Sequence, residues 1–176
     1  MDYIVADNYL CFLALLEMIF RAEGIIISQY DLAEKYGVTV PIGYVTNITN
    51  VKYSAVQDDL GVIITPKSLQ QILNDLNSNM QVFFLSALHT NEFELESILR
   101  QQFAKGKYII FAFSYGVLYS KESYYDLGHV SLLHEIINDD LLQIYDPGPD
   151  NPGIKNVRIS DMYDAMRKKG GIYILG

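Results

Sequence analysis

The sequence has little cysteine, little positive charge and no long apolar run. A single cysteine among 176 residues permits no internal disulfide, so nothing indicates an oxidising compartment. Thirteen Lys and Arg stand against 21 Asp and Glu, and the net charge of −8 excludes the basic surface typical of nucleic-acid-binding proteins. An anionic membrane would repel such a chain, and the apolar stretch of residues 10–20 contains Glu17 and is too short to span a bilayer. We therefore expect neither nucleic acid nor membrane as a partner.

The start and the length of the chain set the expected location and domain count. Met1-Asp2-Tyr3-Ile4 lacks the basic start of a signal peptide, so a cytoplasmic protein is expected. A protein exported by a route that needs no signal peptide would have the same kind of N-terminal sequence. Half of the residues are hydrophobic, and 176 residues are enough for one domain, residues 1–176, with a real core.

The hydrophobic periodicity and the Gly, Pro and capping residues predict helices first and strands later. The expected helices are residues 8–23, 28–37, 65–76, 91–105 and 160–169, and the expected strands are residues 80–88, 108–113, 129–137, 141–145, 157–159 and 171–175. Asp7 or Asn8 is the expected cap of the first helix. Residues 38–64 read as irregular chain with at most short extended pieces, and Asn138-Asp139-Asp140 reads as a hairpin turn. This order predicts an α+β fold with a mainly antiparallel sheet.

The only cysteine, Cys11, lies where the first helix should begin. A thiol in the first turn of a helix is close to the positive end of the helix dipole, which favours the thiolate. The other interpretation is that Cys11 is a small buried hydrophobic residue, as lone cysteines commonly are.

Two later segments supply a base and an orienting acid for such a thiol. His129 follows Gly128 at the start of an expected strand, and Asp146 precedes Pro147 at the end of the next strand. His134 lies five residues after His129, so regular alternation puts it on the opposite, apolar face, as a packing histidine. Asp146 could also serve only as a turn former.

Taken together, the helix opened by Cys11, the Gly128-His129 strand and the Asp146-Pro147 strand end resemble the papain-like cysteine peptidase superfamily. The nearest resemblance is to the bacteriocin-processing (double-glycine leader) peptidase family and its soluble relatives. That family has a Met-Ile-Leu-like patch after the cysteine and then a glycine, as in Met18-Ile19-Phe20 and Gly24 here. The resemblance covers most of the chain through loose patterns.

The resemblance implies a papain-like fold, with the N-terminal catalytic helix packed on the sheet, and a thiol hydrolase that acts on a peptide or amide bond. Cys11 would be the nucleophile, His129 the base and Asp146 the residue that orients the imidazole. The substrate would be a peptide or protein. No cofactor is implied, and no cluster has the spacing of metal ligands.

The sequence departs from that family at two positions. The family places Gln six residues before the cysteine as an oxyanion donor, where this chain has Val5, and it usually has Gly after the cysteine, where this chain has Phe12. Asn8, or the backbone N–H of Cys11, would then be the oxyanion donor. A second alignment matches Cys11 to a later cysteine of the family and puts Asp7 at the catalytic position.

Three functions therefore stay open. Hydrolysis and acyl transfer use the same triad, and related acyltransferases also lack a clear Gln before the cysteine. A catalytically degenerate domain that only binds a peptide or protein partner is the alternative from another class.

Overall fold

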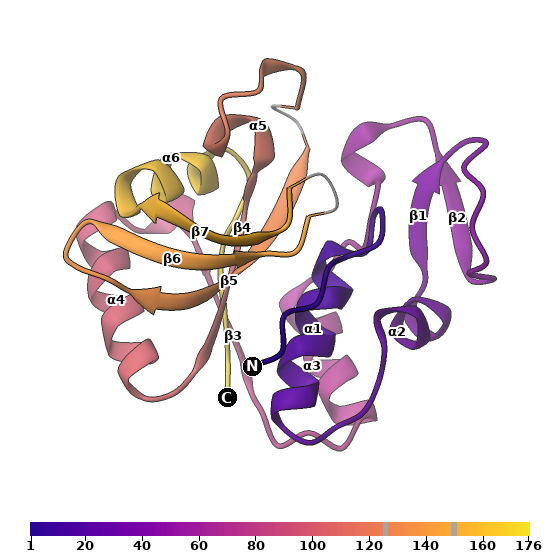
Figure 1. Ribbon diagram of the computed structural model, residues 1–176, viewed down its shortest axis with the longest axis horizontal. Coiled ribbons are helices and arrows are strands. Elements are labelled where there is room, and N and C mark those ends of the chain that lie inside the picture. The colour runs from indigo at the N-terminus through magenta and orange to yellow at the C-terminus, as the bar shows by residue number, and fades with distance from the viewer. Residues whose placement is uncertain (125–126, 149–150) are drawn as a thin grey trace. The chain divides into compact units, whose positions relative to one another are not determined.

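The computed structural model describes residues 1–124, 127–148 and 151–176. It shows a mixed helix and sheet fold with a mainly antiparallel six-stranded sheet (Figure 1), so the α+β prediction is confirmed at that level. The contacts divide the chain into two compact units. Unit 1 consists of Met1–Ile63 and Asp146–Gly153, and unit 2 consists of Ile64–Tyr145 and Ile154–Gly176. No helix in the described part of the chain is long and apolar enough to cross a membrane.

Unit 1 begins with a buried helix. Its elements are α1 (Cys11–Ala22), α2 (Gln29–Tyr36), β1 (Val38–Pro41), β2 (Val51–Ser54) and the 3₁₀ helix η1 (Gln57–Asp59). Nine consecutive residues of α1, 12–20, are buried, which agrees with a helix that is apolar on nearly every side. Ser28, where the sequence places the start of the second helix, caps α2 through a capping box with Asp31. Two short parallel strands, β1 and β2, are the only strands within residues 38–64, as expected for that irregular region.

Unit 2 contains most of the sheet. Its elements are α3 (Pro66–Asp75), β3 (Val82–Ser86), η2 (Ala87–His89), α4 (Glu92–Ala104), β4 (Tyr108–Ser114), α5 (Tyr115–Leu118), η3 (Glu122–Tyr124), β5 (Gly128–Ile136), β6 (Leu141–Asp146), β7 (Gly153–Arg158), α6 (Ile159–Lys169) and β8 (Gly171–Leu175). The first residue of β7 and the last residue of β6 belong to unit 1. Thr65 and Asn91, where the sequence places the starts of two helices, are the N-caps of α3 and α4.

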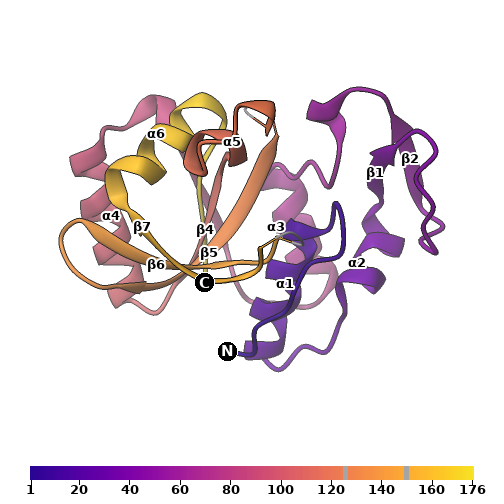
Figure 2. The same ribbon diagram turned by 45° about the horizontal axis from the view of Figure 1, so that its top comes forward.

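The strand order of the large sheet is β3-β8-β4-β5-β6-β7. β5 and β6 form the predicted hairpin, in which Leu132 pairs with Tyr145. β5 pairs with β4 on its other side, so His129 lies opposite Phe113. Helices α4 and α6 lie against one face of this sheet (Figure 2). They pack on it through apolar residues such as Leu99, Phe111 and Met162. The core of unit 2 therefore holds β5, and with it His129, in a fixed register.

β7 and α5 are among the elements that differ from the sequence prediction. β7 begins at Gly153 rather than at residue 157, and Ile159, predicted as the end of that strand, begins α6 instead. The short helix α5 was not predicted; the hydroxyl of Ser114 caps it by accepting a hydrogen bond from the Val117 N–H.

Candidate functional site

Cys11 is the first residue of α1, so it lies in the first turn of this helix as expected, and its side chain is half-buried. The predicted helix start at residue 8 and the predicted caps Asp7 and Asn8 are wrong, because the N-cap is Leu10 and no side chain caps this helix. Residues 7–10 form a turn of their own. In that turn the Leu10 N–H donates to the Asp7 carbonyl over 3.0 Å, and Tyr9 has a φ of 69°.

The backbone N–H of Cys11 makes no hydrogen bond within the described part of the chain. It belongs to the first turn of α1, where N–H groups have no carbonyl one turn earlier to bond with. An unpaired N–H at the positive end of a helix dipole stabilises negative charge on an oxygen beside it. This N–H has the donor chemistry that an oxyanion site needs.

Asn8, the predicted side-chain donor, is exposed, and its backbone N–H donates to Asp7 Oδ1 over 2.7 Å. Its side-chain amide has no hydrogen-bond partner among the described residues, so capping does not occupy it. Val5 has a side chain that is 48% exposed and offers no donor, and its carbonyl accepts a hydrogen bond from Gln29.

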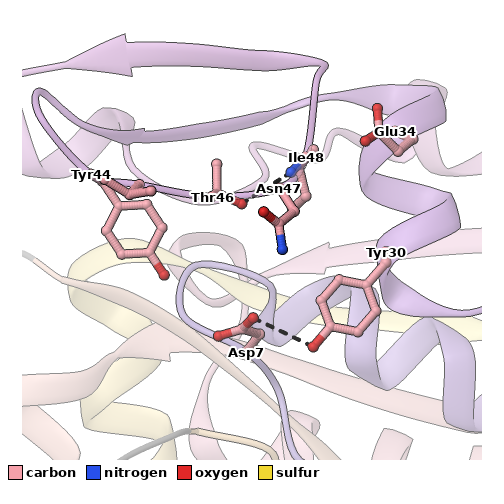
Figure 3. Close-up of a pocket in the computed structure, with 8 residues that line it drawn as sticks. Asp7, Tyr30, Glu34, Tyr44, Thr46, Asn47 and Ile48 are labelled. Atoms are coloured by element: carbon pink, nitrogen blue, oxygen red, sulfur yellow. Dashed lines mark hydrogen bonds between the residues drawn. The ribbon is translucent and has the colours of Figure 1, made fainter.

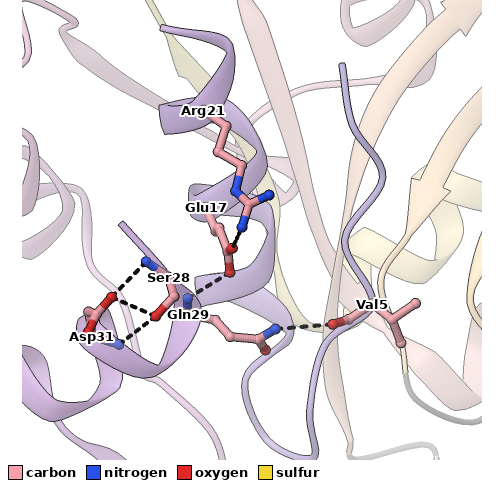
Figure 4. A network of polar contacts seen from close by, with 6 residues as sticks. All are labelled: Val5, Glu17, Arg21, Ser28, Gln29 and Asp31. Atoms are coloured by element: carbon pink, nitrogen blue, oxygen red, sulfur yellow. Dashed lines mark hydrogen bonds and ion pairs between the residues drawn. The ribbon is translucent and has the colours of Figure 1, made fainter. Parts of the chain in front are cut away.

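A polar network that the sequence analysis missed joins the segment before α1 to α2 (Figure 4). Gln29 is buried; its Nε2 donates to the Val5 carbonyl over 3.1 Å, and its Oε1 accepts the Asp7 N–H over 2.9 Å. The Gln29 N–H donates to Glu17 Oε2 over 2.7 Å. Arg21 donates to the other oxygen of Glu17 over 2.6 Å. The backbone of residues 5–7 is therefore fixed by side-chain bonds.

The sequence contains one indication of this network, which is Glu17, the single charged residue within the apolar run of residues 10–20. Glu17 is only 4% exposed, and a buried carboxylate requires donors. The sequence could therefore have predicted a partner, but not that Gln29 would supply its backbone N–H.

His129 lies on β5 and is 7% exposed. Its ring meets the rings of Phe113 and Tyr115 edge to face, at centroid distances of 5.5 and 5.2 Å. His134 is half-buried and packs on Tyr145 at 4.4 Å, which fits a packing role. The predicted regular alternation stops before His134, because the β5–β6 register shifts between residues 133 and 135.

Asp146 is completely buried at the end of β6. Its Oδ1 accepts the Gly148 N–H over 2.9 Å, so the carboxylate does shape the turn that follows. Two further bonds within unit 1 tie this turn to the N-terminal segment: the Tyr3 hydroxyl donates to the Asp146 carbonyl, and the Ala6 N–H donates to the Pro147 carbonyl over 2.8 Å. Burial raises the pKa of the Tyr3 phenol above its ordinary value.

The three predicted triad residues belong to different units. Cys11 and Asp146 lie in unit 1, and His129 lies in unit 2. The structure therefore describes the surroundings of each residue, and the triad itself stays a prediction.

Unit 1 also contains a pocket of about 590 Å³ (Figure 3). It is lined by Asp7, Tyr30, Glu34, Tyr44, Val45, Thr46, Asn47 and Ile48. The sequence had predicted no binding role for these residues. Only Asp7 had been considered for a functional site, at the catalytic position of the second alignment. The signal was weak, because the pocket is formed by three segments that are separated in the chain.

His, Cys, Asp and Glu side chains form no group of three that could hold a metal ion within residues 1–124, 127–148 and 151–176. Comparison with known proteins found no protein-family model and no curated protein that matches this sequence.

Proposed function

We propose that the chain is a papain-like thiol hydrolase, similar to the bacteriocin-processing peptidases, that cleaves a peptide or amide bond. Cys11 is the nucleophile, His129 the general base and acid, and Asp146 the residue that orients the imidazole. The observation that carries the proposal is the position of Cys11: a half-buried thiol at the first residue of α1, with its own N–H unpaired among the described residues. This arrangement provides a nucleophile and an oxyanion donor on one residue.

The proposed reaction has two steps. The Cys11 thiol gives its proton to His129 and its sulfur attacks the substrate carbonyl, and the oxyanion is stabilised by the Cys11 N–H. The imidazolium then protonates the departing amine, which leaves a thioester on Cys11. In the second step His129 takes a proton from water, the hydroxide attacks the thioester, and the acid product and the thiol are released.

Asp146 supports the proposal by its burial. A carboxylate that is completely removed from water requires donors, and the Gly148 N–H supplies one of them. An imidazolium is the kind of donor that such an acid stabilises during catalysis.

Acyl transfer to an amine would use the same residues, with the amine in place of water in the second step. The alternative of a binding domain without catalysis is favoured by Val5. Its side chain offers no oxyanion donor, and its carbonyl is engaged by Gln29. A rate loss of roughly a hundred- to thousand-fold is typical when one oxyanion donor is missing.

The test uses a small acyl thioester, whose acyl group would move to Cys11 with release of the free thiol. Acylation is followed by intact mass on the wild type and on His129→Gln and His134→Gln, with circular dichroism as the check of folding. We expect acylation at Cys11 in the wild type and a loss of at least about a hundredfold in His129→Gln, the size typical of a lost general base. His134→Gln is the matched control and should react within about twofold of the wild type.

Equal rates in the two histidine variants would refute the role of His129. A wild type that is alkylated by iodoacetamide but never acylated would refute the enzyme proposal and favour the binding domain. Release of free acid from the acylated protein indicates hydrolysis, whereas a need for an added amine indicates transfer.

A further inference from the structure

The pocket of unit 1 is formed by three separate segments (Figure 3). Asp7 comes from the segment before α1, Tyr30 and Glu34 come from α2, and the remaining lining residues come from residues 44–48, between β1 and β2. The side chains that line it are mainly acidic, phenolic and amide groups, with Val45 and Ile48 as aliphatic surface.

The two carboxylates of the pocket differ in what they bind. Both oxygens of Glu34 are engaged by the loop: Oε1 accepts the Thr49 N–H over 2.8 Å, and Oε2 accepts the Thr49 hydroxyl over 2.5 Å and the Asn50 N–H over 3.3 Å. These bonds lower the pKa of Glu34, and they fix the loop that forms one wall. Glu34 is therefore a structural residue of the pocket.

Asp7 is the carboxylate that is available to a ligand. Its Oδ1 accepts the Asn8 N–H, while its Oδ2 has only a long hydrogen bond of 3.4 Å from the Tyr30 hydroxyl. No Lys or Arg in the described part of the chain forms an ion pair with Asp7. A carboxylate that accepts so few hydrogen bonds and forms no such ion pair attracts a cationic donor.

Two tyrosines complete the polar surface around Asp7. Figure 3 shows the hydroxyl ends of Tyr30 and Tyr44 pointing toward Asp7 from two sides. The Tyr44 ring is held edge to face against Tyr9 at 5.2 Å, which fixes its position. Phenol oxygens accept hydrogen bonds from ammonium groups, and aromatic rings attract cations. Val45, which is 90% exposed, offers aliphatic contact at the same pocket.

We infer that this pocket binds the side chain of a Lys or Arg residue of a peptide, with its charged end against Asp7 and the two tyrosine hydroxyls and its methylene stem against Val45. The net charge of −8 favours approach of a basic peptide. The inference rests on the proposed function in one respect, which is that the bound peptide is a substrate. Asp7 lies four residues before Cys11 in the chain, so a peptide bound here would lie beside the segment that leads to the nucleophile.

The test measures binding without turnover. Uniformly ¹⁵N-labelled Cys11→Ala protein is titrated with Nα-acetyl-lysine methylamide and, separately, with Nα-acetyl-norleucine methylamide, which has a similar stem and no charge. We expect the lysine compound to shift the amide resonances of residues 7, 30 and 44–48 and to bind about fivefold more tightly at low salt, the size of one exposed ion pair. High salt should reduce this difference.

Asp7→Asn keeps an oxygen for the Asn8 N–H and removes the charge, so it should reduce lysine binding about fivefold. Asp2→Asn is the matched control, since it removes one exposed charge from the same unit outside the pocket, and it should leave binding unchanged. Unchanged amide spectra elsewhere establish that both variants are folded.

Equal binding of the norleucine compound, shifts outside the pocket, or full binding by Asp7→Asn would each overturn the inference. Magnesium chloride is titrated as well, and a response of these resonances to Mg²⁺ but not to lysine would also overturn it. Because the protein lacks Cys11, these results are independent of the acylation test. Lysine binding without wild-type acylation would refute the proposed function alone, and acylation without lysine binding would refute the pocket inference alone.

Discussion

Replacement of Gln29 by Ala tests whether the network beside α1 stabilises unit 1. The change removes two side-chain hydrogen bonds, to the Val5 carbonyl and from the Asp7 N–H, each with a net contribution of about 1 kcal/mol. It also removes a buried methylene group, which contributes about 0.8 kcal/mol. Water can partly replace the lost bonds, because Val5 and Asp7 are exposed. We expect a loss of about 2 kcal/mol in the free energy of unfolding.

The assay is thermal or urea unfolding, monitored by circular dichroism. For a chain of this length, about 2 kcal/mol corresponds to a fall in melting temperature of about 4–8 °C. Gln57→Ala is the matched control, because Gln57 is an exposed residue of the same unit and should change the free energy by less than about 0.5 kcal/mol. A loss below about 0.5 kcal/mol in Gln29→Ala, or an equal loss in both variants, would refute the reasoning.

Four further changes have defined outcomes. Gly171→Ala would place a Cβ 2.1 Å from a backbone carbonyl oxygen of β3, so urea unfolding should show a loss of roughly 3 kcal/mol or more. Ser131→Ala removes a buried hydroxyl without a partner among the described residues, and the same assay should show no loss and a gain of up to about 1 kcal/mol. Hydrogen bonding from the Thr49 side chain lowers the pKa of Glu34. The stability that the Glu34 carboxylate contributes to the fold is therefore complete above the ordinary pKa of about 4.3 and is lost as pH falls through the lowered pKa. The protection factor of the Thr49 amide, which is its exchange rate relative to the intrinsic rate at the same pH, should therefore fall only in acid. We expect the side-chain amide of Asn8 to act as a second oxyanion donor beside the Cys11 N–H, so Asn8→Ala should slow acylation by about a hundredfold. It should leave the unfolding free energy within about 0.5 kcal/mol, since Asn8 caps no helix.

The sequence predicted the elements that depend on local signals. The Asn138-Asp139-Asp140 turn specified the β5–β6 hairpin, and the capping residues Ser28 and Thr65 marked the starts of two helices. Each of these features depends on contacts within a few residues, which a single sequence contains.

The start of α1 was mispredicted because long-range contacts determined it. Asp7 is a good capping residue by type, yet its backbone N–H is bound by Gln29, 22 residues away. Leu10 is almost completely buried, and the chain turns before it rather than capping at Asp7 or Asn8. The pocket beside Asp7 was missed for the same reason, since the loop that completes it is fixed by bonds to Glu34 that no local pattern encodes.

The return of residues 146–153 to unit 1 has a consequence for how the protein is made. Unit 1 cannot be obtained as a continuous fragment: a chain cut after residue 63 would leave the Ala6 N–H without the Pro147 carbonyl and the Tyr3 hydroxyl without the Asp146 carbonyl. During synthesis from the N-terminus, these acceptors emerge from the ribosome more than 80 residues after the rest of the unit. Closing so long a loop costs entropy before its contacts form, so unit 1 should complete its structure late, after the strands up to β6 have been synthesised.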